Sequence, residues 1–452
     1  MQRSIYSQYF RYAVPTVAAM LVNGLYQLVD GIFIGQYLGV DGLAGINIAW
    51  SMIAVLVGIG LMVGVGTGAI TSIYKGQKNL SAARQTISTG LILLILLACL
   101  LSLGLRFFMA DILMWQTQDP DVFQLAMAYM QVVVFTSCFT LSATALPFLI
   151  RNDDSPALAT YLMIIGGGLN IVFDYLFIVV WELGLQGAAI ATAISQGVVT
   201  IVGLSYFFSP AASLRLRRSD LLFFRWQDIR QIVLVGLSSF FMYLYWSVMV
   251  ALHNSQFAIY GGTTALGAYT ILGYVVTFYY LTVEGFANGM QPLVSFNYGA
   301  NQLANIKKLL GLAMGLSVAF GLIVTTVMNL YPNDIIAIFN RDNPELSDYA
   351  TTGIRLHLIA LCLDGFIVVA SSFYQSIHRG KKAVTISLGN ILIQPPFLFL
   401  LPLLLPLGWG LTGVWLAFPI SNIVLSLVVS VILYKDIRRL FHQPPDGMSS
   451  ES

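Results

Sequence analysis

Long apolar stretches, interrupted by short polar segments, run along almost the whole chain. A helix needs about 20 predominantly apolar residues to cross a bilayer, and the stretches predict twelve such spans. They cover residues 9–38, 48–74, 85–108, 122–150, 157–180, 184–208, 229–259, 265–297, 307–331, 347–377, 383–404 and 409–434. We therefore expect an all-α polytopic membrane protein.

A basic segment that begins SPAASLRLRRSD separates the first six spans from the last six. We expect an N-terminal lobe at 1–208, a basic linker at 209–228, a C-terminal lobe at 229–434 and a tail at 435–452. Lysine and arginine favour the cytoplasmic side of a membrane. Nineteen of the 22 fall on the side of the termini and the linker, and Arg106 and Arg341 fall in the opposite loops. Both termini, the linker and the tail are therefore expected on the cytoplasmic side of the membrane.

The composition excludes several classes of function. Hydrophobic residues make up 58% of the chain and charged residues 9%, whereas soluble domains carry about 25% charged residues, so a soluble enzyme is excluded. The chain has no P-loop GK[ST] motif, so we expect no enzymatic activity, no cofactor and an ion gradient as the energy source. Cys99, Cys138 and Cys362 lie in apolar runs without metal or disulfide spacing. The expected partners are membrane lipid and a small molecule, with no nucleic acid, and the chain is expected to be a monomer.

The two halves of the chain resemble each other. SIYKGQKNLSAAR (72–84) matches SFNYGANQLANIK (295–307) at a sequence offset of 223, and LQGAAIATAIS (185–195) matches LTGVWLAFPIS (411–421) at an offset of 226. Because each half has six spans, both halves enter the membrane from the same side. This pattern predicts a parallel repeat around a central cleft, which is typical of carriers that expose the cleft alternately to the two sides.

We single out six ionisable side chains in the predicted spans as candidates, because a charge within the membrane costs several kcal/mol and marks a candidate functional residue. They are Asp30, Asp174, His253, Glu284, Arg355 and Asp364. Asp30, Tyr129, Asp174 and Thr192 all lie about 10 Å below the outer ends of their spans, at 1.5 Å per residue. Asn170 lies one helical turn from Asp174 on the same face. Two carboxylates, an amide, a hydroxyl and a phenol at one level suit a proton or a cation such as Na⁺.

The repeat provides an internal comparison for this cluster. At the offset of 226, Asp174 corresponds to Leu400, Asn170 to Pro396 and Thr192 to Phe418, and at the offset of 223 Asp30 corresponds to His253. The second lobe is therefore expected to lack the oxygen cluster. A cluster needed only for packing should occur in both lobes, so the difference favours a functional role.

Several segments resemble the multidrug and toxic compound extrusion (MATE) family over residues 5 to 440. They are DGIFIGQYLGVDGLAGINIAW in the first span, LNIVFDYLF in the fifth, GLQGAAIATA in the sixth, and SSFYQSIHRGKKA and GLTGVWLAFPIS in the second half. The resemblance is nearest to the bacterial branch with its cation site in the N-terminal lobe. It places that site at Asp30, Tyr129, Asn170, Asp174 and Thr192, with Na⁺ or H⁺ as the coupling ion and Na⁺ ligands expected from Asp30, Asn170 and Asp174.

The resemblance implies a V-shaped pair of lobes and a secondary antiporter that exports organic, often cationic drugs in exchange for inward Na⁺ or H⁺. Some members are proposed to bend the first span at a proline, and Pro15 occupies that place here; a static kink is an equal alternative. Asp364 with His253 is either a second proton-sensitive pair, a drug contact or a structural pair. Glu284 is a candidate for attracting cations in the cleft.

Two alternatives remain open. One is an exporter of a specific metabolite. The other is a lipid-linked oligosaccharide flippase of the same superfamily, in which several basic residues should line the cleft to hold a pyrophosphate. Here no lysine falls in the interior of a predicted span, and Arg355 is the arginine expected to be buried.

Overall fold

The computed structural model describes residues 4–217, 220, 225–339, 343–404 and 410–442, and within these ranges the chain forms helices and connections without a β-strand. The helices are α1 (Ile5–Gly76), α2 (Leu80–Gln116), α3 (Pro120–Asn152), α4 (Pro156–Asp174), α5 (Gly184–Phe208), α6 (Trp226–Gly299), α7 (Leu303–Leu330), α8 (Pro332–Phe339), α9 (Pro344–His357), α10 (Leu361–Ser376), α11 (Gly380–Leu404) and α12 (Gly410–His442). A π-helical turn (Tyr175–Val180) continues α4, and a 3-10 turn (Leu358–Ala360) joins α9 to α10. The predicted all-α membrane fold is confirmed.

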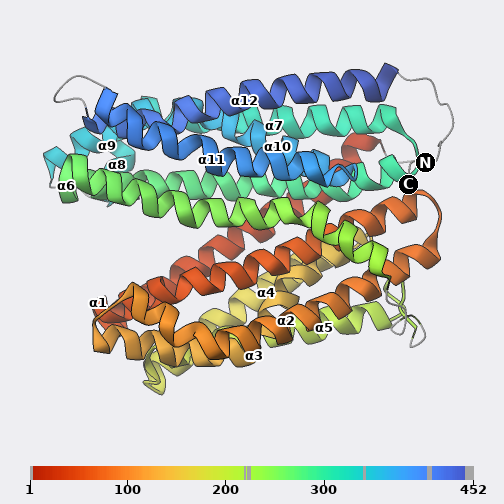
Figure 1. The fold of residues 1–452 in the computed structure, drawn as a ribbon, viewed down its shortest axis with the longest axis horizontal. Coiled ribbons are helices and arrows are strands. Elements are labelled where there is room, and N and C mark those ends of the chain that lie inside the picture. Colours follow the sequence, from red (N-terminus) through yellow and green to blue (C-terminus); the bar gives the residue numbers. More distant parts are fainter. Residues whose placement is uncertain (1–3, 218–219, 221–224, 340–342, 405–409, 443–452) are drawn as a thin grey trace.

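Two helices are long enough to cross a membrane twice. α1 has 72 residues and α6 has 74, and in each a single glycine leaves the helical region, Gly39 at φ +66° and Gly262 at φ +65°. Glycine adopts positive φ without a steric penalty, and the chain reverses direction within each of these helices (Figure 1). In the described part of the chain, ten helices are long and apolar enough to cross a membrane. Because two of them cross twice, they provide the twelve predicted spans.

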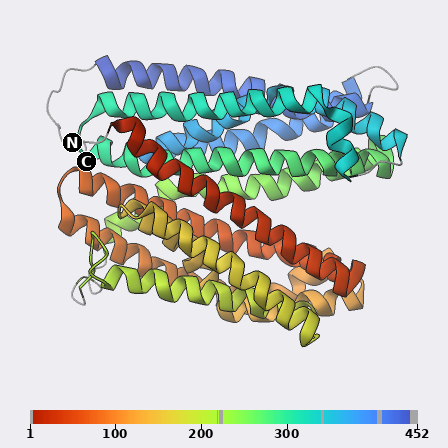
Figure 2. The same ribbon diagram turned by 180° about the vertical axis from the view of Figure 1, so that it is seen from behind.

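The helices form two lobes. α1 to α5 make the N-terminal lobe and α6 to α12 the C-terminal lobe, and the two ribbons diverge toward the end where α1 and α6 reverse (Figures 1 and 2). We call the opposite end, where the lobes touch, the closed end. The first turns of α1 cross to the C-terminal lobe, where Tyr9, Tyr12 and Ala13 join its hydrophobic core. This V shape agrees with the expectation from the sequence.

The backbone repeats between the lobes. Lys78 and Asn301, which follow the two long helices, have φ values of 62° and 57°, and the sequence offset of 223 relates them, as it relates the two glycines at the reversals. Asp154 and His378 have φ values of 67° and 61° and are related by an offset of 224. Left-handed residues of this kind end helices. The predicted parallel repeat is therefore present in the backbone itself.

Glycines allow the lobes to touch backbone to backbone at the closed end. A Cβ atom at Gly236 would collide with the carbonyl oxygen of Met62 in the other lobe. Gly66, Gly76 and Gly299 approach carbonyl oxygens of the opposite lobe in the same way. Small residues are the usual means of bringing membrane helices this close, so the contact depends on the absence of side chains.

The described part of the linker packs onto the N-terminal lobe. Leu214 and Leu216 are buried in the core of that lobe. The N–H groups of Ser213 and Leu214 donate hydrogen bonds to the carboxylate of Asp153, which follows α3. The linker is therefore anchored by both apolar and polar contacts. Arg3, Arg218, Arg341 and residues 443–452 of the predicted tail lie outside the described residues.

We predict that Gly236→Ala destabilises the closed end, because the added methyl group meets the backbone at Met62. Overpacking of this kind costs about 1–3 kcal/mol. Gly315→Ala on α7 is the control, since its Cβ would meet no atom within 4 Å and alanine favours a helix by about 1 kcal/mol over glycine. Thermal unfolding of the purified proteins should show a lower midpoint for Gly236→Ala alone. Equal midpoints would contradict the proposed backbone contact.

Candidate functional site

The five residues of the predicted cation site come from four helices of the N-terminal lobe. Asp30 lies on α1 and Tyr129 on α3, Asn170 and Asp174 lie on the last turns of α4, and Thr192 lies on α5. The π-helical turn begins directly after Asp174. Such turns shift the register of a helix and occur frequently at functional sites. The local backbone thus sets the direction in which the end of α4 presents its carboxylate.

The structure brings these side chains together. The Asn170 amide nitrogen donates to Thr192 Oγ1 at 3.3 Å. The charges of Asp30 and Asp174 are close enough to interact. The Tyr129 hydroxyl interacts with Thr192 and lies within electrostatic range of both carboxylates. All five residues predicted from sequence therefore surround one place.

Several oxygen atoms at this place are buried without a hydrogen-bond partner. Asp30 Oδ1, Asn170 Oδ1 and both carboxylate oxygens of Asp174 have none within the described part of the chain, and the Asp174 side chain is 0% exposed. Leaving a buried polar atom unpaired costs about 1–3 kcal/mol, and more for a charge. Oxygen atoms are the ligands of hard cations. The arrangement can therefore accept a small cation or a proton that the protein itself does not supply.

Sequence reasoning missed Tyr26. This residue lies one turn before Asp30 on α1, and it is within electrostatic range of Asp30 and Asp174. Its ring packs on α4 at Gly167, where an added Cβ would lie 3.0 Å from the Tyr26 ring. The i, i+4 spacing to Asp30 was the available signal. Tyr26 borders the site on the side toward the start of α1.

Pro15 lies on a part of α1 that keeps helical dihedral angles. Its carbonyl oxygen accepts a hydrogen bond from Thr160 Oγ1 of α4 at 2.8 Å. A surface hollow next to it is lined by Arg11, Val14 and Asp154, among others. Proline removes one backbone hydrogen bond and permits a bend, but α1 is continuous here. Bending at Pro15 stays a prediction.

His253 and Asp364 are not paired in the structure. The ring of His253 stacks on Tyr269 with centroids 5.4 Å apart, and among the described side chains it makes no contact with Asp364. Asp364 instead lies within electrostatic range of Tyr279 and Tyr280. The two residues are linked only indirectly: Tyr245 lies within electrostatic range of Asp364, and it donates a hydrogen bond to Gln394, whose amide nitrogen lies next to His253.

The backbone corrects one alignment between the lobes. The first residues of α4 and α11 are related by an offset of 224, not 226. Asn170 therefore corresponds to Gln394 instead of Pro396, and the Gln394 amide nitrogen lies 3.5 Å from His253 Nε2. The second lobe thus keeps an amide at this position, and the expectation that it lost the whole polar cluster was wrong. It lacks the carboxylate, because a leucine occupies the position equivalent to Asp174.

The buried arginine is not the expected one. Arg355 is exposed, whereas Arg151 on the last turn of α3 is 0% exposed and lies 5.1 Å from the ring centre of Phe148. Arg151 follows a predicted span directly, and its sequence position suggested the membrane surface. Glu284 on α6 lies within electrostatic range of Arg151. These two residues bring opposite charges to the contact between the lobes.

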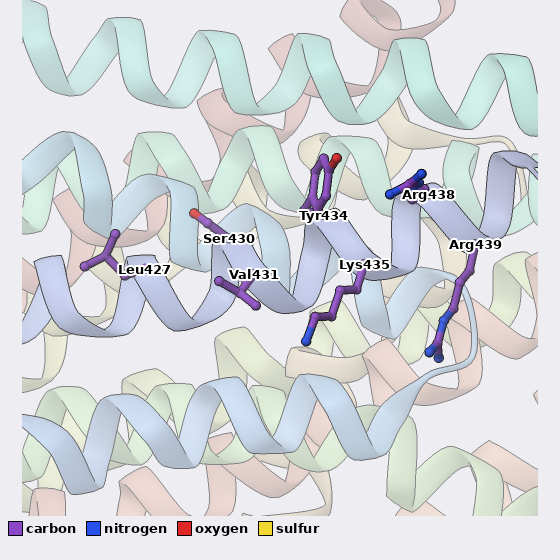
Figure 3. Close-up of a pocket in the computed structure, with 7 residues that line it drawn as sticks. All are labelled: Leu427, Ser430, Val431, Tyr434, Lys435, Arg438 and Arg439. Atoms are coloured by element: carbon purple, nitrogen blue, oxygen red, sulfur yellow. The ribbon is translucent and has the colours of Figure 1, made fainter.

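Other features of the structure do not form a metal or transport site. Within the described residues there is no group of three or more histidine, cysteine, aspartate and glutamate side chains that could hold a metal ion. A surface groove lies along α12, lined by Leu427, Ser430, Val431, Tyr434, Lys435, Arg438 and Arg439 (Figure 3). Its residues come from one helix of the C-terminal lobe, away from Asp30 and Asp174. Basic residues of this kind suit anionic lipid headgroups.

A family model described as MatE matches residues 15–176 and again residues 238–400. Each match falls in one lobe, and together they cover more than half of the chain. The chain belongs to the MatE family. The starts of the two matches are related by the offset of 223 that also relates the two long helices. Membership identifies a membrane transporter and not an enzyme.

Similar proteins extend over almost the whole chain. The multidrug export protein MepA of Staphylococcus saprophyticus subsp. saprophyticus is 23% identical over 438 residues, covering 95% of this chain and 94% of the relative. MepA of Staphylococcus aureus strain MW2 is 24% identical over 437 residues, with 95% and 94% covered. A solved structure of a multidrug resistance MATE family transporter of the MOP superfamily, in an outward-facing conformation, superposes with a TM-score of 0.90 at 21% identity over 98% of both chains. This likeness establishes the MATE fold.

Replacing a buried aspartate by asparagine should have opposite effects on thermal stability at Asp174 and at Asp153. Asp174→Asn should leave the midpoint of thermal unfolding unchanged or raise it. The Asp174 carboxylate has no hydrogen-bond partner to lose among the described residues, and the substitution removes a buried charge. Asp153→Asn should lower stability by about 3 kcal/mol, since hydrogen bonds to a charged group are lost. Asp153 accepts bonds from Tyr206 Oη at 2.7 Å and from two linker N–H groups at 2.8 Å.

Thermal unfolding of both variants in a buffer without Na⁺ provides the measurement. A drop for Asp174→Asn as large as that for Asp153→Asn would mean that Asp174 has a structural partner, which would count against an open cation site.

Proposed function

We propose that this protein is a secondary active antiporter that exports organic, often cationic drugs in exchange for Na⁺ or H⁺. The observation that carries the proposal is the set of buried, unpaired oxygens at Asp30, Asn170 and Asp174, with Tyr129 and Thr192 beside them. Names of similar proteins, which are called multidrug export proteins, support drugs as the substrate class. We further propose a monomer in the bacterial cytoplasmic membrane, with both termini in the cytoplasm.

The coupling ion acts at the pair Asp30 and Asp174. Two like charges at close range repel each other, more strongly in a medium of low dielectric constant than in water. A cation or proton between them relieves this repulsion, and the amide of Asn170 and the hydroxyl of Thr192 complete an oxygen shell. Both ions suit these ligands, so the choice between Na⁺ and H⁺ is left to the experiment below.

Export follows from movement of the lobes around the closed end. In a parallel repeat, rocking the two lobes exposes the space between them to one side at a time. Glycine contacts such as that between Gly236 and Met62 allow the backbones to slide without interlocking side chains. Ion occupancy in the N-terminal lobe biases this movement, because α1, which carries Asp30, also packs against α6 of the other lobe.

The MepA relatives favour drug export over the alternatives. An exporter of one specific metabolite would use the same ion site and differ in its substrate contacts. A flippase for lipid-linked oligosaccharides needs several basic groups for a pyrophosphate, whereas the described spans bury one arginine beside a carboxylate.

Efflux of a fluorescent lipophilic cation from proteoliposomes tests the function, with a Na⁺ gradient and a pH gradient imposed separately. We expect one gradient to drive export, and Asp30→Asn and Asp174→Asn each to reduce it at least about tenfold. Glu345→Gln, at an exposed acid on α9, is the matched control and should transport normally.

Normal gradient-driven export by both aspartate variants would refute the proposed coupling site. Absence of export under either gradient would favour the exporter of a specific metabolite.

A further inference from the structure

Arg151 is a buried cation without a hydrogen-bond partner. Its side chain is 0% exposed, and none of its three guanidinium nitrogens has a partner in the described part of the protein. Burying a charge costs several kcal/mol unless it is paired and hydrogen-bonded. A cation–π contact with the ring of Phe148 offsets part of this cost. It does not replace the missing hydrogen bonds, so the presence of a charge at this position needs a further explanation.

The counter-charge for Arg151 comes from the other lobe. Glu284 on α6 is within electrostatic range of Arg151, but these two described groups do not approach within the 4.0 Å of an ion pair. Glu284 accepts one long hydrogen bond, from Asn288 Nδ2 at 3.4 Å. Next to this pair, Gly285 of α6 packs directly on Val17 of α1. The two charges therefore interact across the contact between the lobes without forming an ion pair.

The repeat indicates that the scaffold does not need a charge at residue 151. At the offset of 224, Arg151 corresponds to Gln375, whose amide donates to Ser238 Oγ at 2.6 Å and to Ser239 Oγ at 2.7 Å. A neutral side chain that bonds within its own lobe is sufficient there. Arg151 thus departs from the pattern of the repeat, as Asp174 does.

The surroundings of Glu284 suit a lipophilic cation. Glu284 is half-buried, and Tyr243 and Tyr280 lie within electrostatic range of its carboxylate. Trp246 meets Tyr280 edge to face with ring centroids 4.9 Å apart. From the N-terminal lobe, Tyr26 lies within electrostatic range of Tyr243. A carboxylate with aromatic rings around it is the environment that attracts organic cations.

We propose that Glu284 binds the cationic group of the substrate, and that Arg151 is the internal counter-charge which the substrate displaces. This inference rests on the proposed export of organic cations. Substrate and Arg151 compete for one carboxylate, so binding of substrate removes the attraction that Glu284 exerts on the opposite lobe. Release of substrate restores it. Occupancy of the substrate site thereby alters the contact between the lobes.

Equilibrium binding of tetraphenylphosphonium to the purified protein, without any ion gradient, tests this proposal. Glu284→Gln should weaken binding at least about tenfold, the effect of losing one charge interaction of about 1.4 kcal/mol. A neutral lipophilic dye should bind to Glu284→Gln with the same affinity as to the wild type. Arg151→Gln, which copies the residue at the equivalent position, should strengthen tetraphenylphosphonium binding about fivefold, because the competing cation is gone. Glu345→Gln is the matched control for the loss of a carboxylate.

Unchanged tetraphenylphosphonium binding by Glu284→Gln would overturn the proposal, and so would weaker binding by Arg151→Gln. If Arg151→Gln does not fold, Arg151→Lys replaces it. Lysine keeps the positive charge, so this variant should bind tetraphenylphosphonium within about twofold of the wild type, and a larger change would count against charge competition. Because binding needs no gradient, these results are independent of the coupling at Asp174. Gradient-driven export that persists in both Asp30→Asn and Asp174→Asn, together with the expected Glu284→Gln effects on binding, would refute the ion site alone.

Discussion

The low dielectric constant of the membrane requires every buried polar group to find a partner inside the protein. The backbone meets this requirement by forming helices throughout the spans. Most buried polar side chains meet it too: Asp153 accepts bonds from Tyr206 and from the linker. Against this background, the unpaired oxygens near Asp174 and the unpaired guanidinium of Arg151 are exceptions. A protein retains such costly groups where an ion, a substrate or another conformation supplies the missing partner.

The internal repeat shows which parts of the scaffold serve the fold and which serve function. The glycines at the reversals and at the lobe contact occur in both halves, because backbone reversal and close approach are needed twice. The polar residues differ between the halves. Asp30 corresponds to His253, and Arg151 corresponds to Gln375. Two lobes of equal architecture therefore carry different polar residues, and the proposed ion site belongs to one of them.

Hydropathy alone predicted the twelve spans, and helical spacing alone placed Asn170 and Asp174 on one face, because both depend on local periodicity. The sequence also indicated the level of Tyr129 and Thr192. It did not indicate the burial of Arg151, since a residue at the end of a predicted span is normally at the surface and only packing between the lobes covers it. The role of Gln394 was missed for a related reason. Its alignment with Asn170 depends on where α11 begins, and helix boundaries are poorly defined by composition.

The ion site and the contact between the lobes are close enough to influence each other. Tyr26 lies within electrostatic range of Asp30 and Asp174 on one side, and of Tyr243 on the other. Tyr243 in turn lies within electrostatic range of Glu284. In the proposed mechanism, a cation at Asp30 and Asp174 changes the field at Tyr26, and a substrate at Glu284 changes the field at Tyr243. Since these tyrosines belong to different lobes, both proposed ligands act on the same contact between α1 and α6.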